Sequence, residues 1–136
     1  MEHDHAVATK TNPNYATLLA FRNALRGFLA WSDDCARAAG VTPAQHQLLL
    51  AVRGRAEAPT IGDVAADLRL RHHSAGELVN RAEAAGLVAR GQDEDDRRVF
   101  RLYLTPAGER VLRELTQQHV DEIRRLTPIV DALSGD

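Results

Sequence analysis

A charged turn between two short apolar runs is the feature that most constrains how this chain folds. The first run opens at Leu87 and Val88, and the second extends from Val99 to Leu104 with polar or aromatic side chains interleaved. An unbroken charged segment, residues 93–98, separates the two runs. Short runs of this kind on either side of a polar turn predict a β-hairpin, here with the charged residues at its tip.

Helical patterns precede the hairpin. Residues 14–39 repeat apolar side chains at alternating steps of three and four, which predicts one amphipathic helix that ends at Gly40. Residues 42–45, Thr-Pro-Ala-Gln, form a strong helix start, because the Thr and Gln side chains can cap each other's backbone and Pro costs nothing at the first position. This second helix is expected to end near Gly54.

The next two helices are predicted to form a helix-turn-helix. Thr60 caps a short helix, residues 69–71 make the turn, and a second helix ends at Gly86. A hairpin directly after a helix-turn-helix makes a winged helix, an arrangement used mostly to bind DNA. A last helix opens at residues 105–106, Thr-Pro, and a second Thr-Pro pair at residues 127–128 is expected to kink or restart it.

This element order predicts a mainly α (α+β) fold: a winged helix-turn-helix with a two-stranded wing and terminal helices that form a dimerisation region. Residues 1–13 are expected to be a disordered tail, and residues 14–136 a single domain with its winged-helix core at residues 41–105. The terminal helices, residues 14–40 and 106–134, carry apolar stripes outside this core. A second copy of the chain is the simplest partner for those stripes.

Composition narrows the possible function classes. A length of 136 residues with 44% hydrophobic residues allows one domain with its own core. No apolar run is long enough to span a bilayer, and residues 1–13 lack the apolar segment of a secretory signal. The single cysteine suits a reducing compartment. We therefore expect a cytoplasmic protein with no membrane partner. The net charge of −2 does not itself indicate nucleic acid. No catalytic or metal-binding pattern occurs, so we expect no enzyme activity, metal or cofactor.

Several motifs resemble those of the MarR family of transcriptional regulators. Residues 96–98, Asp-Arg-Arg, followed by Leu-Thr at 104–105 and then Gly108, are similar to the family's wing. Upstream, residues 78–81, Leu-Val-Asn-Arg, and residues 86–90, Gly-Leu-Val-Ala-Arg, resemble family motifs in the same register. Each motif alone is weak evidence, but the wing combined with the Gly-Leu-Val-x-Arg motif is fairly specific.

The resemblance implies a sequence-specific DNA-binding transcriptional regulator. By resemblance the chain is a homodimeric repressor, or less often an activator. Its recognition helices then enter successive major grooves of double-stranded DNA at a palindromic operator, and its wings enter the minor groove. Many members of the family release DNA when a small phenolic or other anionic ligand binds, so a small aromatic or anionic effector is a candidate partner.

By the same resemblance, Arg98 enters the minor groove with Asp96 bracing its guanidinium, a role that suits a planar and always charged side chain. Arg97 is then a phosphate contact, residues 93–95 are expected to be solvated, and Arg81 is expected to form a structural ion pair. The outward side of the second motif helix is expected to read bases. The predicted DNA-binding residues are Arg69, Arg71, His72, His73, Ser74, Gly76, Glu77, Asn80, Arg90, Asp96, Arg97 and Arg98.

Two positions depart from the family pattern, because Gly76 and Glu77 stand where Thr and Arg are common. A carboxylate can accept a hydrogen bond from cytosine but repels phosphate, which shifts the expected readout toward residues 72–74. The alternative function is a winged helix that contacts protein without specific DNA binding. Arg90 is expected either to reach a phosphate or to pair with an acid such as Asp93.

The terminal helices supply the predicted dimer contacts. These are Leu18, Phe21, Leu25, Leu115, Ile123, Ile129, Val130 and Leu133. Cys35 lies on the apolar stripe of the first helix, where nothing lowers its pKa, so packing is a better interpretation than redox sensing. His46 and His119 lie on helices that could approach each other, and we interpret them as packing side chains rather than zinc ligands.

Overall fold

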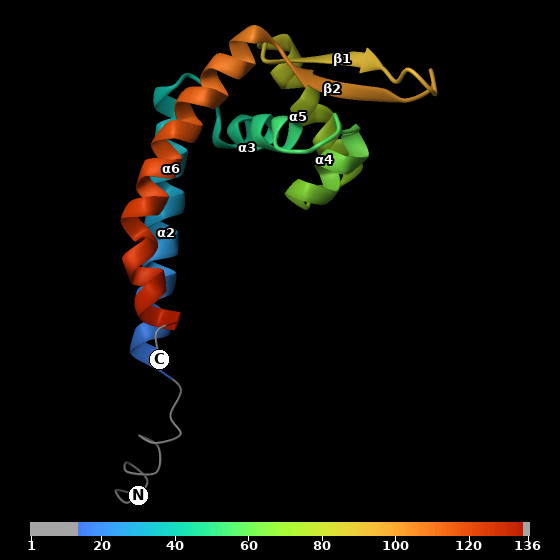
Figure 1. Ribbon diagram of the computed structural model, residues 1–136. Helices are drawn as coiled ribbons and strands as arrows, with labels where there is room; N and C mark the ends of the chain where they lie inside the picture. The colour runs from blue at the N-terminus through green and yellow to red at the C-terminus, as the bar shows by residue number, and fades with distance from the viewer. Residues whose placement is uncertain (1–13, 135–136) are drawn as a thin grey trace, which may run out of the picture.

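The structure is a computed structural model that describes residues 14–134, with side chains described as far as Ala132. The expected tail, residues 1–13, lies outside the described residues. The elements in chain order are α2 (Tyr15–Ala38), α3 (Pro43–Arg53), α4 (Ile61–Leu68), α5 (His72–Ala84), β1 (Val88–Gln92), β2 (Phe100–Leu104) and α6 (Pro106–Ser134). Figure 1 shows α2 and α6 side by side as a long stem, with the remaining elements gathered at one end as a head. We use stem for α2 with α6, and head for residues 41–104.

The predicted helix starts are confirmed by their caps. The hydroxyl of Thr42 accepts the backbone N–H of Gln45 at 3.0 Å, and the Gln45 side-chain oxygen accepts the N–H of Thr42 at 2.9 Å. Thr60 and Asp63 make the same reciprocal pair at the start of α4. Because these caps satisfy backbone donors that a helix start leaves without partners, the local sequence is enough to set where α3 and α4 begin.

The helix-turn-helix is confirmed as α4 and α5. The turn between them passes through Arg69, whose φ of 57° lies in the left-handed region that residues other than glycine rarely adopt. Ala75, Val79 and Ala82 of α5 are buried against the rest of the head. The opposite side of α5 therefore remains at the surface.

The core is centred on α3. Its Leu48 and Leu49 are completely buried, and the helix contacts α2 and α6 of the stem as well as α4, α5 and β2 of the head. Leu102 of β2 and Leu115 of α6 join the same core. The prediction that Leu115 contacts a second copy is wrong, because α6 packs on α2 and α3 and leaves this side chain 0% exposed within one copy.

The hairpin has the predicted form. β1 and β2 are antiparallel, with Val88 opposite Leu104 and Gln92 opposite Phe100. The backbone N–H of Leu102 donates to the carbonyl of Pro59 at 2.8 Å, which joins β2 to the loop before α4. The hairpin projects from the head away from the stem, as a wing (Figure 1).

The last helix spans the expected residues, 106–134, as one element. A restart near residues 127–128 is wrong, because α6 continues through Pro128 to Ser134. The Thr127 hydroxyl donates to the carbonyl of Ile123 at 3.0 Å, so this turn keeps a hydrogen bond beside the proline, and packing on α2 supports the helix. Across the described residues, no helix is both long enough and apolar enough to cross a membrane.

A cluster of aromatic rings lies where the stem meets the head. The ring centroid of His119 on α6 lies 4.8 Å from both Trp31 of α2 and His46 of α3. His119 Nδ1 lies 2.7 Å from the Leu115 carbonyl and therefore carries the hydrogen, which leaves Nε2 to accept from the Ser32 hydroxyl at 2.6 Å. This packing agrees with the interpretation of both histidines as packing groups.

Burial governs the titratable groups near this junction. Burial lowers the pKa of His46, which is 7% exposed, and the neighbouring His119 lowers it further, while Asp33 acts in the opposite direction. Burial likewise raises the pKa of the half-buried Cys35 thiol, with Asp34 adding to the effect. Cys35 therefore lacks the environment that makes a thiol reactive.

Gly108 is predicted to be essential for the packing of α6 on the head. A Cβ at this position would lie 2.2 Å from the carbonyl oxygen of Leu87, a backbone atom that cannot rotate away. We expect Gly108→Ala to lower the free energy of unfolding by about 2 kcal/mol, as overpacking of a core does. Urea unfolding at a fixed protein concentration measures this.

Gly76→Ala is the matched control, because a Cβ there meets no atom within 4 Å and the residue lies inside α5. That substitution should stabilise the protein by about 0.5–1 kcal/mol. Equal effects of the two substitutions would contradict the close approach of α6 to Leu87.

His46 should make the fold acid-sensitive. Because the pKa of His46 is lower in the folded state, the unfolded chain binds protons first as the pH falls below about 6.5. Stability is therefore complete above that pH and is lost progressively as the pH falls toward the lowered pKa. As the pH is lowered from about 7.5 to 5, the urea midpoint of the wild type should fall, and that of His46→Gln should change less. The exposed His72 gives the control His72→Gln, and an identical pH profile for all three proteins would rule out His46 as the cause.

Candidate nucleic-acid interface

The exposed side of α5 carries most of the predicted base-reading residues. His72, His73, Ser74, Glu77 and Asn80 are all exposed. Gly76 is half-buried, and as glycine it offers only its backbone. The structure thus gathers the predicted side chains of this helix on one solvent-facing surface.

Two of these side chains have partners on the helix itself or on the wing. His73 Nε2 lies 3.3 Å from Glu77 Oε1, one helical turn apart, so the Glu77 carboxylate has a nearby group that becomes cationic when His73 is protonated. The Asn80 side-chain oxygen accepts a hydrogen bond from Arg90. Asn80 therefore presents its amide nitrogen, rather than both polar atoms, to a ligand.

Arg90 joins the base of the wing to α5. Its Nε lies 3.3 Å from Glu83 Oε1, and its Nη2 donates to Asn80. The expectation that Arg90 pairs with an acid is met by Glu83, whereas Asp93 is not its partner. Glu83 precedes the wing on α5, and only the packing of β1 on α5 brings it near Arg90.

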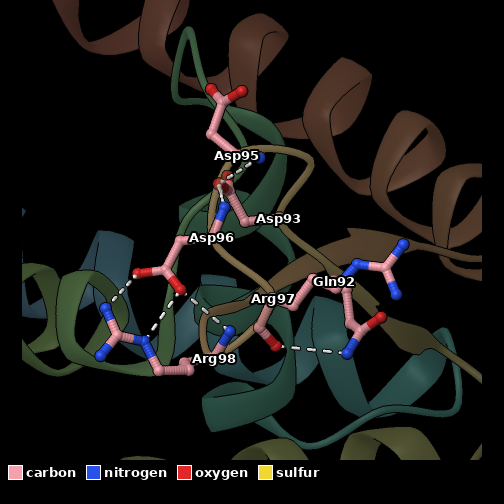
Figure 2. Close-up of polar contacts among 6 residues, drawn as sticks. All are labelled: Gln92, Asp93, Asp95, Asp96, Arg97 and Arg98. Atoms are coloured by element: carbon pink, nitrogen blue, oxygen red, sulfur yellow. Dashed lines mark hydrogen bonds and ion pairs between the residues drawn. The ribbon is translucent and has the colours of Figure 1, made fainter.

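At the wing tip, Asp96 holds the Arg98 side chain, which is exposed to solvent. Figure 2 shows the Asp96 carboxylate facing the Arg98 guanidinium, with Nε 3.1 Å from Oδ1 and Nη2 3.2 Å from Oδ2. The Arg98 backbone N–H also donates to Asp96 Oδ1 at 3.0 Å. The Arg98 side chain is still 90% exposed, so the expected bracing by Asp96 leaves most of its surface free. Arg98 holds the pKa of the Asp96 carboxyl below its usual range.

Asp93 is not the solvated turn residue that was expected. Its side chain is only 18% exposed, and Oδ1 accepts from Arg101 Nε at 2.6 Å. Oδ2 accepts the backbone N–H groups of Asp95 and Asp96, each at 3.0 Å (Figure 2). Arg101, and then these backbone donors, keep the pKa of the Asp93 carboxyl below its usual range.

Arg101 makes contacts at the candidate site that sequence reasoning missed. Its Nη1 donates to the carbonyl of Ala58 at 2.7 Å, while its Nε holds Asp93. The alternation along β2 indicated that Arg101 lies on the side of the strand opposite to Leu102. The partner in the loop before α4 could not be found from the local pattern, because it lies 43 residues earlier.

The remaining predicted arginines are unpaired within the described part of the chain. Arg69, Arg71 and Arg97 are exposed and have no acid within ion-pair distance there. Arg81 is also exposed, and no acid of residues 14–132 lies within ion-pair distance of it, so the structural ion pair predicted for it is not found there. Gln92 donates to the backbone carbonyl of Arg97 at 3.2 Å, which leaves the Arg97 guanidinium free (Figure 2).

The stem carries a second surface with a different character. An open apolar groove of about 360 Å³ runs between α2 and α6, lined among others by Phe21, Leu25, Phe28, Ile129 and Val130. Most predicted dimer residues lie in or beside it. Leu18, Leu25, Ile123, Ile129 and Val130 are exposed and Phe21 is half-buried, whereas the side chain of Leu133 lies outside the described residues.

Comparisons with known proteins find similarity to transcriptional regulators in the head of this chain. Residues 39–99 match the model of the MarR family. A Bacillus subtilis (strain 168) protein described as the uncharacterized HTH-type transcriptional regulator YsmB is 34% identical over 65 residues, which is 48% of this chain and 44% of that protein. The match therefore spans less than half of the relative's length.

Comparison with solved structures shows that the similarity in fold includes the stem as well as the head. The crystal structure of a MarR family transcription regulator superposes with a TM-score of 0.72 at 24% identity, covering 93% of this chain and 82% of the other. A mutant of Staphylococcus aureus MepR bound to an oligodeoxyribonucleotide gives a TM-score of 0.68 at 20% identity, covering 86% and 84% of the two chains. The wing motif, the family match over residues 39–99 and the stem-and-head architecture thus all point to the MarR family, whose model this chain matches across its head.

Proposed function

We propose that this chain is a sequence-specific DNA-binding transcriptional regulator that acts as a homodimer and carries no enzymatic activity. The observation that carries the proposal is Arg98, which Asp96 orients at the wing tip while 90% of the side chain stays exposed. Such a guanidinium fits the minor groove, where the negative potential favours arginine. In this proposal the protein acts in the cytoplasm, with residues 41–105 as the DNA-binding core.

The exposed side of α5 is the proposed major-groove reader. The amino end of α5 has no side-chain cap, so its first backbone N–H groups are free for a phosphate oxygen. His72, His73 and Ser74 lie at that end, beside the unpaired Arg69 and Arg71. We assign the arginines to phosphates, which position the protein, and residues 72–74 with Asn80 to base edges, which give specificity.

The stem groove is the proposed dimer interface. Its lining is apolar apart from Thr127, so it offers almost nothing to orient a small polar ligand, whereas a second copy buries apolar surface without that need. Leu18, which is 57% exposed, and Leu25 extend the same apolar surface along α2. The dimerisation region of this proposal is residues 14–40 with 106–134.

From the family resemblance we further propose that the protein is a repressor, that its operator is palindromic and that a small aromatic or anionic molecule is its effector. The MepR structure in complex with an oligodeoxyribonucleotide supports the DNA partner. We assign no effector pocket to this chain, because we propose that the second copy of the chain occupies the stem groove.

One observation favours the alternative of a protein-contact module. Glu77 lies in the middle of the proposed reading surface and would repel phosphate. Its pairing with His73 reduces that repulsion when the histidine is protonated. Salt dependence separates the two functions, since DNA binding through several phosphates weakens steeply with salt, with a log–log slope near −0.9 per contact.

Selection from a randomised duplex library tests the proposed function. The wild type should enrich a pseudo-palindromic sequence, and affinity for the enriched duplex should fall steeply with salt. Arg98→Ala should weaken binding to that duplex by about tenfold, because it removes the minor-groove contact. Fluorescence anisotropy at several salt concentrations measures both effects.

Arg113→Ala serves as the charge-matched control, since Arg113 is an exposed arginine of α6 outside the head. It should leave affinity nearly unchanged. No enriched sequence, or a flat salt response, would favour the protein-contact alternative. An equal loss for both variants would mean that bulk charge, not the wing contact, drives binding.

The dimer is tested by placing a charge in the stem groove. Leu25→Glu with Ile129→Glu should convert a dimer into a monomer in sedimentation velocity, because an unpaired carboxylate in an apolar interface is costly. Leu50→Glu is the control, because Leu50 is an exposed apolar residue of α3 outside the stem. A wild-type monomer at micromolar concentration, or variants that remain dimeric, would contradict this assignment.

A further inference from the structure

A continuous series of hydrogen bonds joins the wing tip to the base of the helix-turn-helix. It begins at the carbonyl of Ala58, which accepts from Arg101 Nη1 at 2.7 Å, next to the bond from Leu102 N–H to Pro59 at 2.8 Å. Ala58 and Pro59 directly precede Thr60, the cap of α4. Arg101 therefore anchors β2 to the backbone segment from which the helix-turn-helix starts.

The series continues through Asp93. One carboxylate oxygen accepts from Arg101 Nε at 2.6 Å, and the other accepts the N–H groups of Asp95 and Asp96. The Arg101 and Asp93 side chains are 30% and 18% exposed, so solvent screens this ion pair less than a fully exposed pair. Asp93 thus links the side chain of Arg101 to the backbone of the wing tip by hydrogen bonds at both of its oxygens.

The series ends at Arg98. Asp96, whose N–H is held by Asp93, accepts three bonds from Arg98: one from its backbone N–H and two from its guanidinium. Arg98, whose side chain is 90% exposed, is therefore connected to Ala58 through Asp96, Asp93 and Arg101 in turn. Each link is a charge-assisted hydrogen bond, a kind that is roughly twice as strong as one between neutral groups.

We propose that Arg101 is a positioning residue that sets where Arg98 meets DNA and does not bind DNA itself, an inference that rests on the proposed DNA-binding function. Its Nε and Nη1 point inward to Asp93 and Ala58, and the nearby acids Glu57 and Asp63 add negative charge around it. A guanidinium so engaged is a poor phosphate contact. Fixing the wing before binding reduces the ordering cost of the complex and so raises affinity.

The first test needs no DNA. Arg101→Gln should speed hydrogen exchange of the Asp95 and Asp96 amides several-fold, because Asp93 loses the cation that fixes it, while the buried Val79 amide of α5 should keep its protection. Asp93→Asn, which keeps the side-chain shape but loses the charge, should produce the same local change. Unchanged exchange at the wing tip in both variants would overturn the proposal.

The second test is a double-mutant cycle on the duplex enriched by the wild type. Arg101→Gln should weaken binding by about tenfold, similarly to Arg98→Ala. The double variant should bind no more weakly than Arg98→Ala alone, because Arg101 acts through Arg98. Arg113→Gln controls for the lost charge. Hydroxyl-radical footprints should show that Arg101→Gln loses the minor-groove protection but keeps the protection around α5.

The outcomes separate this inference from the proposed function. Additive losses in the cycle would mean that Arg101 contacts DNA on its own, and this would overturn the positioning role while leaving DNA binding intact. A wild type that enriches no duplex would instead refute the DNA-binding function, and with it the purpose assigned to Arg101. Non-additive losses together with faster local exchange would support the positioning role.

Discussion

The packing of α3 against both stem and head is the interaction on which the rest of the structure depends. Leu48 and Leu49 are completely buried there, and α3 contacts α2, α4, α5, α6 and β2. Because α3 of the head also packs on α2 and α6, the exposed surface of α5 has a fixed orientation relative to the stem. If two stems pair, the two copies of α5 are held at a fixed separation without further contacts between the heads.

The tip of the wing is held in place by charged side chains rather than by apolar burial. This exposed tip has little apolar surface, so its geometry relies on Asp93, Asp96 and their arginine partners. These acids offset the positive charge of the arginines, and the net charge of −2 for the whole chain therefore gives no hint of a DNA-binding surface. In the proposed function the relevant difference is local, because the Arg98 side chain is 90% exposed while that of Asp93 is 18% exposed.

Local rules were enough to predict the elements, and they failed where distant segments meet. The Thr42 and Thr60 caps and the hairpin need only neighbouring residues, so they could be read from the sequence. The Arg101 contact with Ala58 depends on how the chain closes on itself. An apolar stripe likewise cannot distinguish a side chain buried within one copy, such as Leu115, from one left exposed for a partner, such as Ile129. The family resemblance supplied the roles of the wing residues, which local physics alone did not.

In the proposed function, two copies of this protein present α5 and the wing to neighbouring grooves of one duplex. A hydroxyl-radical footprint of the wild type on its enriched duplex measures this most directly. We expect two protected regions centred about 34–36 Å apart, each with minor-groove protection beside it. A single protected region, or two regions without the minor-groove component, would contradict it.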